Sequence, residues 1–93
     1  MKTTMKVIFD RSAWEDYVGW QVENKVIFKR INELIKAMLR DPYAGPGKPE
    51  PLKHALAGCW SRRIAAEHRL VYAVREDVMH ILQCRFHYGQ TSQ

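Results

Sequence analysis

An imidazole and a phenol stand side by side near the end of the chain, at His87 and Tyr88. Their candidate chemical partners lie upstream: a carboxylate at Glu50 and guanidinium groups at Arg63 and Arg69. Cleavage of RNA without a metal needs a base that takes the 2′-OH proton, cations for the charge that grows on the phosphorane, and an acid for the departing 5′-oxygen. We predict that Glu50, the two arginines and His87 supply these functions.

The segment around Glu50 should hold its carboxylate in place, because the flanking Pro49 and Pro51 restrict the backbone. Lys53 is near enough in the sequence to act beside Glu50. Tyr88 can orient the phosphate or stack on a base, and such stacking contributes roughly 1–3 kcal/mol per base in proteins that bind single strands. Lys53 and Tyr88 complete the predicted catalytic set.

The chain is basic, with 15 Lys and Arg against 10 Asp and Glu and a formal net charge of +5. In so small a protein this excess favours a polyanion or an acidic protein as partner, and charge alone does not choose between them. We expect contacts with RNA or the ribosome from basic residues beside the predicted site and on the outer faces of a predicted helix: Lys48, Lys53, Arg62, Arg63, Lys25 and Lys29.

Two helices are predicted in the first half of the chain. Ser12 and Glu15 fit a capping box, which predicts a helix over about residues 13–23. Asn24 can cap a second helix, and the Asp41-Pro42 pair should end it. The apolar residues of this second helix recur at a period of about 3.6 residues: Ile27, Ile31, Leu34, Ile35 and Met38.

The second half of the chain is predicted to form a sheet. Residues 41–51 are rich in Pro and Gly and should form an exposed, semi-rigid loop. Residues 60–65, 68–74 and 78–86 alternate or are rich in β-formers, which predicts a three-stranded antiparallel meander. With a short strand from about Lys6, the order of strand, two helices and meander predicts an α+β fold with a single sheet.

Alternation assigns the side chains of the meander to two faces of the sheet. The core face should hold Leu70, Tyr72, Val74, Val78, Leu82, Cys84 and Phe86. The open face should hold Arg63, Arg69, Val71, Gln83, Arg85 and His87. Arg62 shares the parity of the core residues Trp60 and Ile64, so we expect the first strand of the meander to fray, bulge or lie at an edge there.

A length of 93 residues favours one domain over residues 1–93, with residues 1–5 as a leader and residues 89–93 as a flexible tail. No apolar run approaches the roughly 20 residues of a membrane helix, which favours a cytoplasmic protein. Cys59 and Cys84 lack CxxC spacing and are expected to be reduced, buried thiols. The histidines lack metal-ligand spacing, and no Gly-rich loop leads into a helix, which argues against a metal site and against nucleoside triphosphate chemistry.

Each candidate residue also fits a plainer role. Glu50 reads equally as a solvated carboxylate in a Pro-rich loop, and arginines on an exposed strand often serve solubility or edge protection. A histidine near a chain end, such as His87, is often without a chemical role. The complementary roles of the set strengthen the functional interpretation, although on composition and parity alone the plainer interpretation stays the commoner one.

Five segments resemble the YoeB toxins of the RelE superfamily: residues 31–36, 47–54, 60–64, 67–74 and 84–88. The resemblance spans roughly Met5 to Tyr88 and implies a RelE-like fold. It implies a bacterial toxin of a type II toxin-antitoxin pair, which binds the A site of the 70S ribosome and cuts the mRNA there. It also implies a YefM-like antitoxin, a toxin homodimer, and contact with operator DNA only through the antitoxin.

The resemblance gives roles to individual residues. Glu50 resembles the general base of the family, His87 the general acid, and Arg69 the arginine that stabilises the transition state. Three further residues match supporting positions: Lys53, Arg63 and Tyr88. The product would carry a 2′,3′-cyclic or 3′-phosphate and a free 5′-OH, and no metal or cofactor would be required.

Two other functional classes stay open. A gyrase-directed toxin of the ParE kind shares the fold but lacks the RNA-cleaving residues, so the presence of Glu50, Arg69 and His87 argues against it. A basic module that only binds its antitoxin and nucleic acid is the other alternative.

Residues 89–93 depart from the family pattern, because members commonly stop at the His-Tyr pair.

Overall fold

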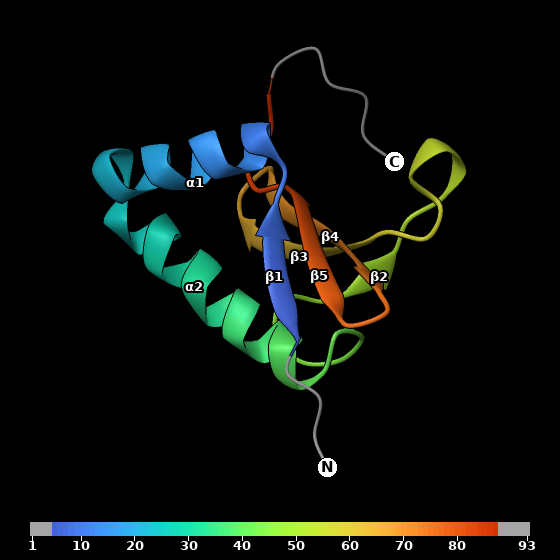
Figure 1. Ribbon diagram of the computed structural model, residues 1–93. Coiled ribbons are helices and arrows are strands. Elements are labelled where there is room, and N and C mark those ends of the chain that lie inside the picture. Colours follow the sequence, from blue (N-terminus) through green and yellow to red (C-terminus); the bar gives the residue numbers. More distant parts are fainter. Residues whose placement is uncertain (1–4, 88–93) are drawn as a thin grey trace.

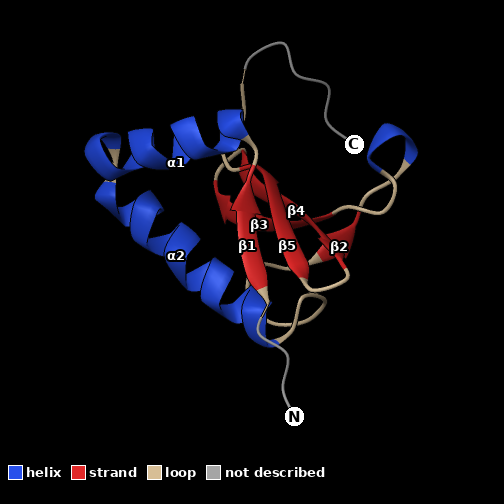
Figure 2. Ribbon diagram, in the orientation of Figure 1, coloured by secondary structure: helices blue, strands red, loops and turns tan. Residues whose placement is uncertain are grey.

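The computed structural model describes residues 5–87 of the chain and shows two helices and five strands, with a short 3-10 helix, η1, in a connecting segment (Figures 1 and 2). The elements are β1 (Lys6–Phe9), α1 (Arg11–Glu23), α2 (Lys25–Arg40), β2 (Glu50–Pro51), η1 (His54–Leu56), β3 (Trp60–Ala65), β4 (His68–Arg75) and β5 (Val78–Gln83). The predicted α+β fold is confirmed, and the two-residue β2 is an additional strand.

The strands form one sheet in the order β1-β5-β4-β3-β2. β1 runs parallel to β5, and the other neighbours are antiparallel. Figure 1 shows α1 and α2 on the same side of this sheet. The sheet therefore has one face covered by helices and one face, the open face, that is not.

The two helix starts differ in how well the sequence predicted them. α1 begins at Arg11 with Asp10 as its N-cap and without a side-chain cap hydrogen bond. The predicted capping box is wrong, because Ser12 already lies inside the helix. In α2 the prediction is confirmed: the Asn24 side-chain oxygen accepts hydrogen bonds from the Val26 and Ile27 amides, both at 3.1 Å.

The main core lies between the helices and the sheet. Its buried residues come from both helices, from β3, β4 and β5 and from Cys84 after β5, and the fully buried ones include Ile31, Leu34, Met38, Leu70, Tyr72, Met79 and Ile81. Met5 packs against this core. The expectation that Met5 belongs to a flexible leader is therefore wrong, and the remainder of that leader and the predicted tail lie outside the described residues.

The alternation predicted for β5 is wrong over most of the strand. Met79 and Ile81 are fully buried in the core, whereas Leu82 packs on the open face. The pairing with β4 shifts at this point, because Tyr72 pairs with Ile81 while Val71 pairs with Gln83, so Leu82 is an extra residue. Such a bulge reverses the parity of a strand.

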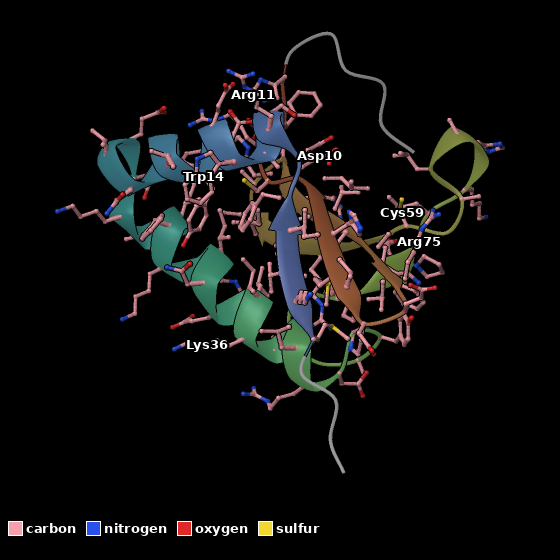
Figure 3. The ribbon with its side chains drawn as sticks, in the orientation of Figure 1. Asp10, Arg11, Trp14, Lys36, Cys59 and Arg75 are labelled. Atoms are coloured by element: carbon pink, nitrogen blue, oxygen red, sulfur yellow. The ribbon has the colours of Figure 1, made fainter. Side chains whose placement is uncertain are left out.

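A small second apolar cluster lies on the open face. It consists of Cys59, Val71 and Ala73, against which Leu52, Leu56 and Leu82 pack. In Figure 3, Cys59 and Arg75 lie on the side of the sheet away from the helices, and Trp14 and Lys36 lie on the helix side. A shallow pocket of about 370 Å³ opens here, lined by Cys59, Ala73, Arg75, His80 and Leu82.

Candidate functional site

The carboxylate of Glu50 and the guanidinium of Arg69 lie together on the open face. Glu50 belongs to the edge strand β2, where it pairs with Ser61 of β3, and Arg63 of β3 pairs with Arg69 of β4. Residues paired across strands point to the same face of a sheet. The Arg69 NH1 atom is 3.8 Å from Glu50 Oε1, so the predicted base and the predicted transition-state cation are brought together.

Both of these side chains are open to solvent. The Glu50 side chain is 56% exposed and that of Arg69 is 39% exposed. An ion pair at this exposure contributes little to stability, roughly 0–1 kcal/mol. The pair therefore has little value as a structural contact, and its groups are accessible to a bound polyanion.

Further cations surround this pair. Arg63 is exposed and shares the open face with Arg69 through their pairing. Lys48 and Lys53 are exposed on the two sides of β2. Lys48 takes a left-handed backbone conformation, with φ 51°, in the turn before the strand. The open edge of the sheet thus carries one carboxylate among several positive charges.

Arg62 has a different position from the one that we predicted. It is 0% exposed, and its guanidinium donates four hydrogen bonds of 2.7–3.0 Å. Three go to the carbonyls of Asp41, Ala44 and Pro46, and one goes to the Tyr72 hydroxyl. The expected contact of Arg62 with RNA is therefore wrong, because its charge is used inside the protein.

The contacts of Arg62 shape the loop that leads to β2. The Tyr72 hydroxyl donates to the carbonyl of Pro42 at 2.6 Å, and the Arg63 amide donates to the carbonyl of Gly47 at 2.6 Å. Gly47 has a φ of 88°, and a Cβ there would lie 3.0 Å from the Arg62 Cβ. The loop is thus packed directly on Arg62, which fixes the path of the chain toward Glu50.

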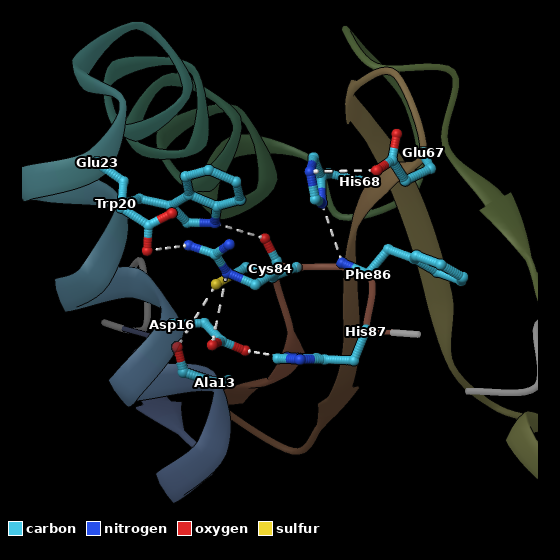
Figure 4. A network of polar contacts seen from close by, with 10 residues as sticks. Ala13, Asp16, Trp20, Glu23, Glu67, His68, Cys84, Phe86 and His87 are labelled. Atoms are coloured by element: carbon cyan, nitrogen blue, oxygen red, sulfur yellow. Dashed lines mark hydrogen bonds and ion pairs between the residues drawn. The ribbon is translucent and has the colours of Figure 1, made fainter. Parts of the chain in front are cut away.

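His87 lies against α1. Its Nε2 atom is 2.6 Å from Oδ2 of Asp16, and its side chain is 48% exposed (Figure 4). The sequence placed His87 on the open face with Arg63 and Arg69, whereas the contact found here is with a helix on the other side of the sheet. Tyr88 lies outside the described residues.

A network of polar contacts holds the segment before His87. The Trp20 Nε1 donates to the carbonyl of Cys84 at 3.0 Å, and the Phe86 amide donates to Nδ1 of His68 at 3.0 Å (Figure 4). Arg85 was expected on the open face, and this is wrong. Its guanidinium stacks 3.7 Å from the centre of the Trp20 ring. The segment leaves the sheet after Gln83 and crosses to the helix side.

The two thiols are free and buried, as predicted. Burial, with a smaller contribution from the neighbouring Asp16 carboxylate, raises the pKa of the Cys84 thiol to about 12. The Cys84 thiol also donates to the carbonyl of Ala13 at 3.5 Å. It is therefore a neutral structural group and not a nucleophile.

Comparison with known proteins identifies the family. The model of the YoeB-like toxin of bacterial type II toxin-antitoxin systems matches residues 9–88. The chain belongs to this family. It is 58% identical over 84 residues to Toxin YoeB of Escherichia coli K12, an alignment that covers 90% of this chain and 100% of that protein.

Solved structures of YoeB proteins have the same fold. The YoeB/ParE toxin from Agrobacterium tumefaciens has a TM-score of 0.87 and 50% identity, with 90% of this chain and 100% of that chain covered. YoeB of Staphylococcus aureus, solved in a heterotetrameric complex with YefM and as a dimer, has TM-scores of 0.85 and 0.84. It is 44% identical in both structures, over 92% of this chain and 100% of that chain.

The remaining predicted basic residues of this YoeB-family toxin form a separate surface. Lys25 and Lys29 are exposed on α2, which covers the opposite face of the sheet from Glu50 and Arg69. The structure does not bring them to the candidate site. Among residues 5–87 no helix is long and apolar enough to cross a membrane, and no cluster of three or more His, Cys, Asp or Glu is placed to hold a metal ion.

Asp16, which contacts the predicted acid His87 in this YoeB-family toxin, was not among the residues that the sequence indicated. The two residues are 71 positions apart, and an acidic residue on a surface helix is normally solvated. The signal that was available is its place on α1 four residues before Trp20. Residues at that spacing lie on the same face of a helix.

Proposed function

We propose that this YoeB-family toxin is a ribosome-dependent endoribonuclease, which cuts mRNA in the A site of the 70S ribosome and so inhibits translation. The observation that carries the proposal is the Glu50–Arg69 pair. A carboxylate lies 3.8 Å from a guanidinium on an exposed edge of the sheet, with Arg63 in register beside it. This is the pairing of a base with charge stabilisation that attack by a 2′-oxygen requires.

In the proposed reaction Glu50 takes the proton of the 2′-OH, and the 2′-oxygen attacks the adjacent phosphorus. Arg69 and Arg63 stabilise the negative charge that grows on the phosphorane. The bond from phosphorus to the 5′-oxygen then breaks, and His87 gives that oxygen a proton. The products are a 2′,3′-cyclic phosphate and a free 5′-OH, and the steps require no metal or cofactor, because side chains supply both proton transfers.

The remaining residues of the set support substrate binding. Lys48 and Lys53 flank β2 and are exposed, so they are available to phosphates of the mRNA or of ribosomal RNA. Lys25 and Lys29 would contact the ribosome from a different surface. Tyr88, which follows His87 directly, would orient the phosphate or stack on a base.

The partners of this toxin follow from its relatives. YoeB of S. aureus is found in a heterotetrameric complex with YefM and as a dimer. We infer a YefM-like antitoxin and a homodimer for this chain, in the cytoplasm of a bacterium, with operator DNA contacted only through the antitoxin. The net charge of +5 suits an acidic inhibitor.

The test is single-turnover cleavage of mRNA on translating ribosomes by Glu50→Gln, Arg69→Ala and His87→Gln variants. Removal of a general acid or base typically costs about 10²–10⁴ in rate, and we expect losses in that range with ribosome binding retained. Arg75→Gln is the matched control, because Arg75 is an exposed arginine of β4 outside the proposed site. Undiminished cutting by all three site variants would refute the mechanism, and inactivity of the wild type would favour a module that only binds.

A further inference from the structure

We propose that Asp16 of α1 is a positioning residue for the acid step, and that it acts by orienting His87. The inference rests on the proposed function, because it takes His87 to be the group that protonates the departing 5′-oxygen. It adds a residue from the helix layer to a site whose other groups come from the sheet and from the segment after β5.

The contact itself is short and specific. Oδ2 of Asp16 lies 2.6 Å from Nε2 of His87, within the range of a charge-assisted hydrogen bond. The Asp16 side chain is only 19% exposed and that of His87 is 48% exposed, so the contact is shielded from water on the Asp16 side. A carboxylate that binds one ring nitrogen fixes the tautomer and the direction of an imidazole, and thereby determines how the other nitrogen is used.

Asp16 is itself held in place from its other side. Its Oδ1 lies 3.7 Å from Nε of Arg85, and the Arg85 NH2 donates to Glu23 at 2.8 Å. The Arg85 guanidinium is stacked on the Trp20 ring and is 20% exposed. Asp16 therefore has a fixed cation on one oxygen and His87 on the other.

The backbone before His87 is fixed as well. Trp20 binds the carbonyl of Cys84, and His68 accepts from the Phe86 amide. Nε2 of His68 lies 3.8 Å from Oε2 of Glu67. Figure 4 shows these contacts arranged around the segment that carries His87, with α1 on one side and the sheet on the other. These contacts hold the segment that carries His87, and the Asp16 carboxylate contacts its ring.

The experiment compares two leaving groups in single-turnover cleavage on ribosomes. One mRNA has the natural 5′-oxygen at the cut, and the other has a bridging sulfur there, because a thiolate departs without protonation. The variants are Asp16→Asn, His87→Gln and, as the matched control, Glu15→Gln. Glu15 neighbours Asp16 on the same helix and pairs instead with Arg11, at 3.4 Å.

We expect Asp16→Asn to slow cleavage of the oxygen substrate by about 10-fold or more, as a part of the 10²–10⁴ that an acid contributes. On the sulfur substrate its loss should fall to about 2-fold or less, and His87→Gln should show the same rescue. A double variant should be no slower than His87→Gln alone, because residues that act as a unit are not additive. Glu15→Gln should match the wild type on both substrates.

An equal loss of Asp16→Asn on both substrates would overturn the inference and reduce Asp16 to a structural role. A faster Asp16→Asn enzyme would also overturn it, because Asp16 would then restrain His87. If His87→Gln itself is not rescued by sulfur, the acid assignment in the proposed function fails, whatever Asp16 does. Thermal unfolding and ribosome binding of each variant separate these results from a loss of folded protein.

Discussion

Replacement of the buried Arg62 by Met should destabilise the protein strongly, and comparison with the adjacent Arg63 makes the prediction specific. Arg62→Met keeps most of the aliphatic stem but removes four hydrogen bonds from a charged donor. A hydrogen bond to a charged group contributes about 1.5–3 kcal/mol, so the full loss of all four would destabilise the folded state by several kcal/mol. Asp41 and Ala44 are exposed residues, however, so water can replace part of this loss.

We therefore expect a loss of about 3–4 kcal/mol in the free energy of unfolding, equivalent to about two hydrogen bonds from a charged donor, with water replacing the others. Urea unfolding of the purified protein, followed by tryptophan fluorescence, measures it. Because small domains are stable by only about 5–15 kcal/mol, the midpoint should shift clearly. Arg63→Met should change the same quantity by less than about 0.5 kcal/mol, since Arg63 is exposed.

A difference of less than about 1 kcal/mol between the two Met variants in the free energy of unfolding would refute the structural role of Arg62, because this is less than one hydrogen bond to a charged group contributes.

The contacts of Arg62 also predict an effect on cleavage. The loop that Arg62 holds leads directly to Glu50, so Arg62→Met should slow cleavage on ribosomes even at temperatures where the variant is fully folded. Unchanged cleavage by the folded variant would show that the path of this loop does not position Glu50.

Three further predictions test single contacts by the same unfolding measurement. Tyr72→Phe should cost about 1–2 kcal/mol, because the hydroxyl both accepts from Arg62 and donates to Pro42; no change would contradict a tight loop clamp. Asn24→Ala should cost about 1 kcal/mol through loss of the α2 cap, and Asn24→Gly less. Burial and the Asp16 carboxylate raise the pKa of Cys84 from 9.0 to about 12, so the unfolded chain loses this proton first. The free energy of unfolding should then fall from pH 9 toward 12, by at most about 1.4 kcal/mol per pH unit, and a Cys84→Ala variant that falls as steeply would contradict this.

The parts of the fold that were predictable are those set by local pattern. α2 shows a continuous helical period, an Asn cap and a stop before Pro42, and it is found over Lys25–Arg40. β4 alternates regularly, with Leu70 and Tyr72 in the core and Val71 on the open face. In both elements the residues predicted for the core face are the ones that pack in or against the core.

The errors lie where a distant contact decides the outcome. The bulge at Leu82 adds one residue to β5, and the alternation of side chains alone contains no mark of it. Arg62 has the parity of a core residue, and the sequence offered no reason to bury a charge. The reason is a set of carbonyls from 16 to 21 positions away, which the loop of residues 41–46 turns toward the guanidinium.

In the candidate site, too, some positions follow from local pattern and others depend on contacts between distant residues. Arg63 and Arg69 could be placed on one face from the parity of their strands, whereas Glu50 was predicted in a loop and reaches that face through β2, which pairs with β3. His87 could not be placed, because the chain leaves the sheet after β5 and the stacking of Arg85 on Trp20 draws the segment toward α1. The sequence therefore predicts the groups that the proposed chemistry needs, while the position of His87, the proposed acid, involves a contact with Asp16 that the sequence alone does not reveal.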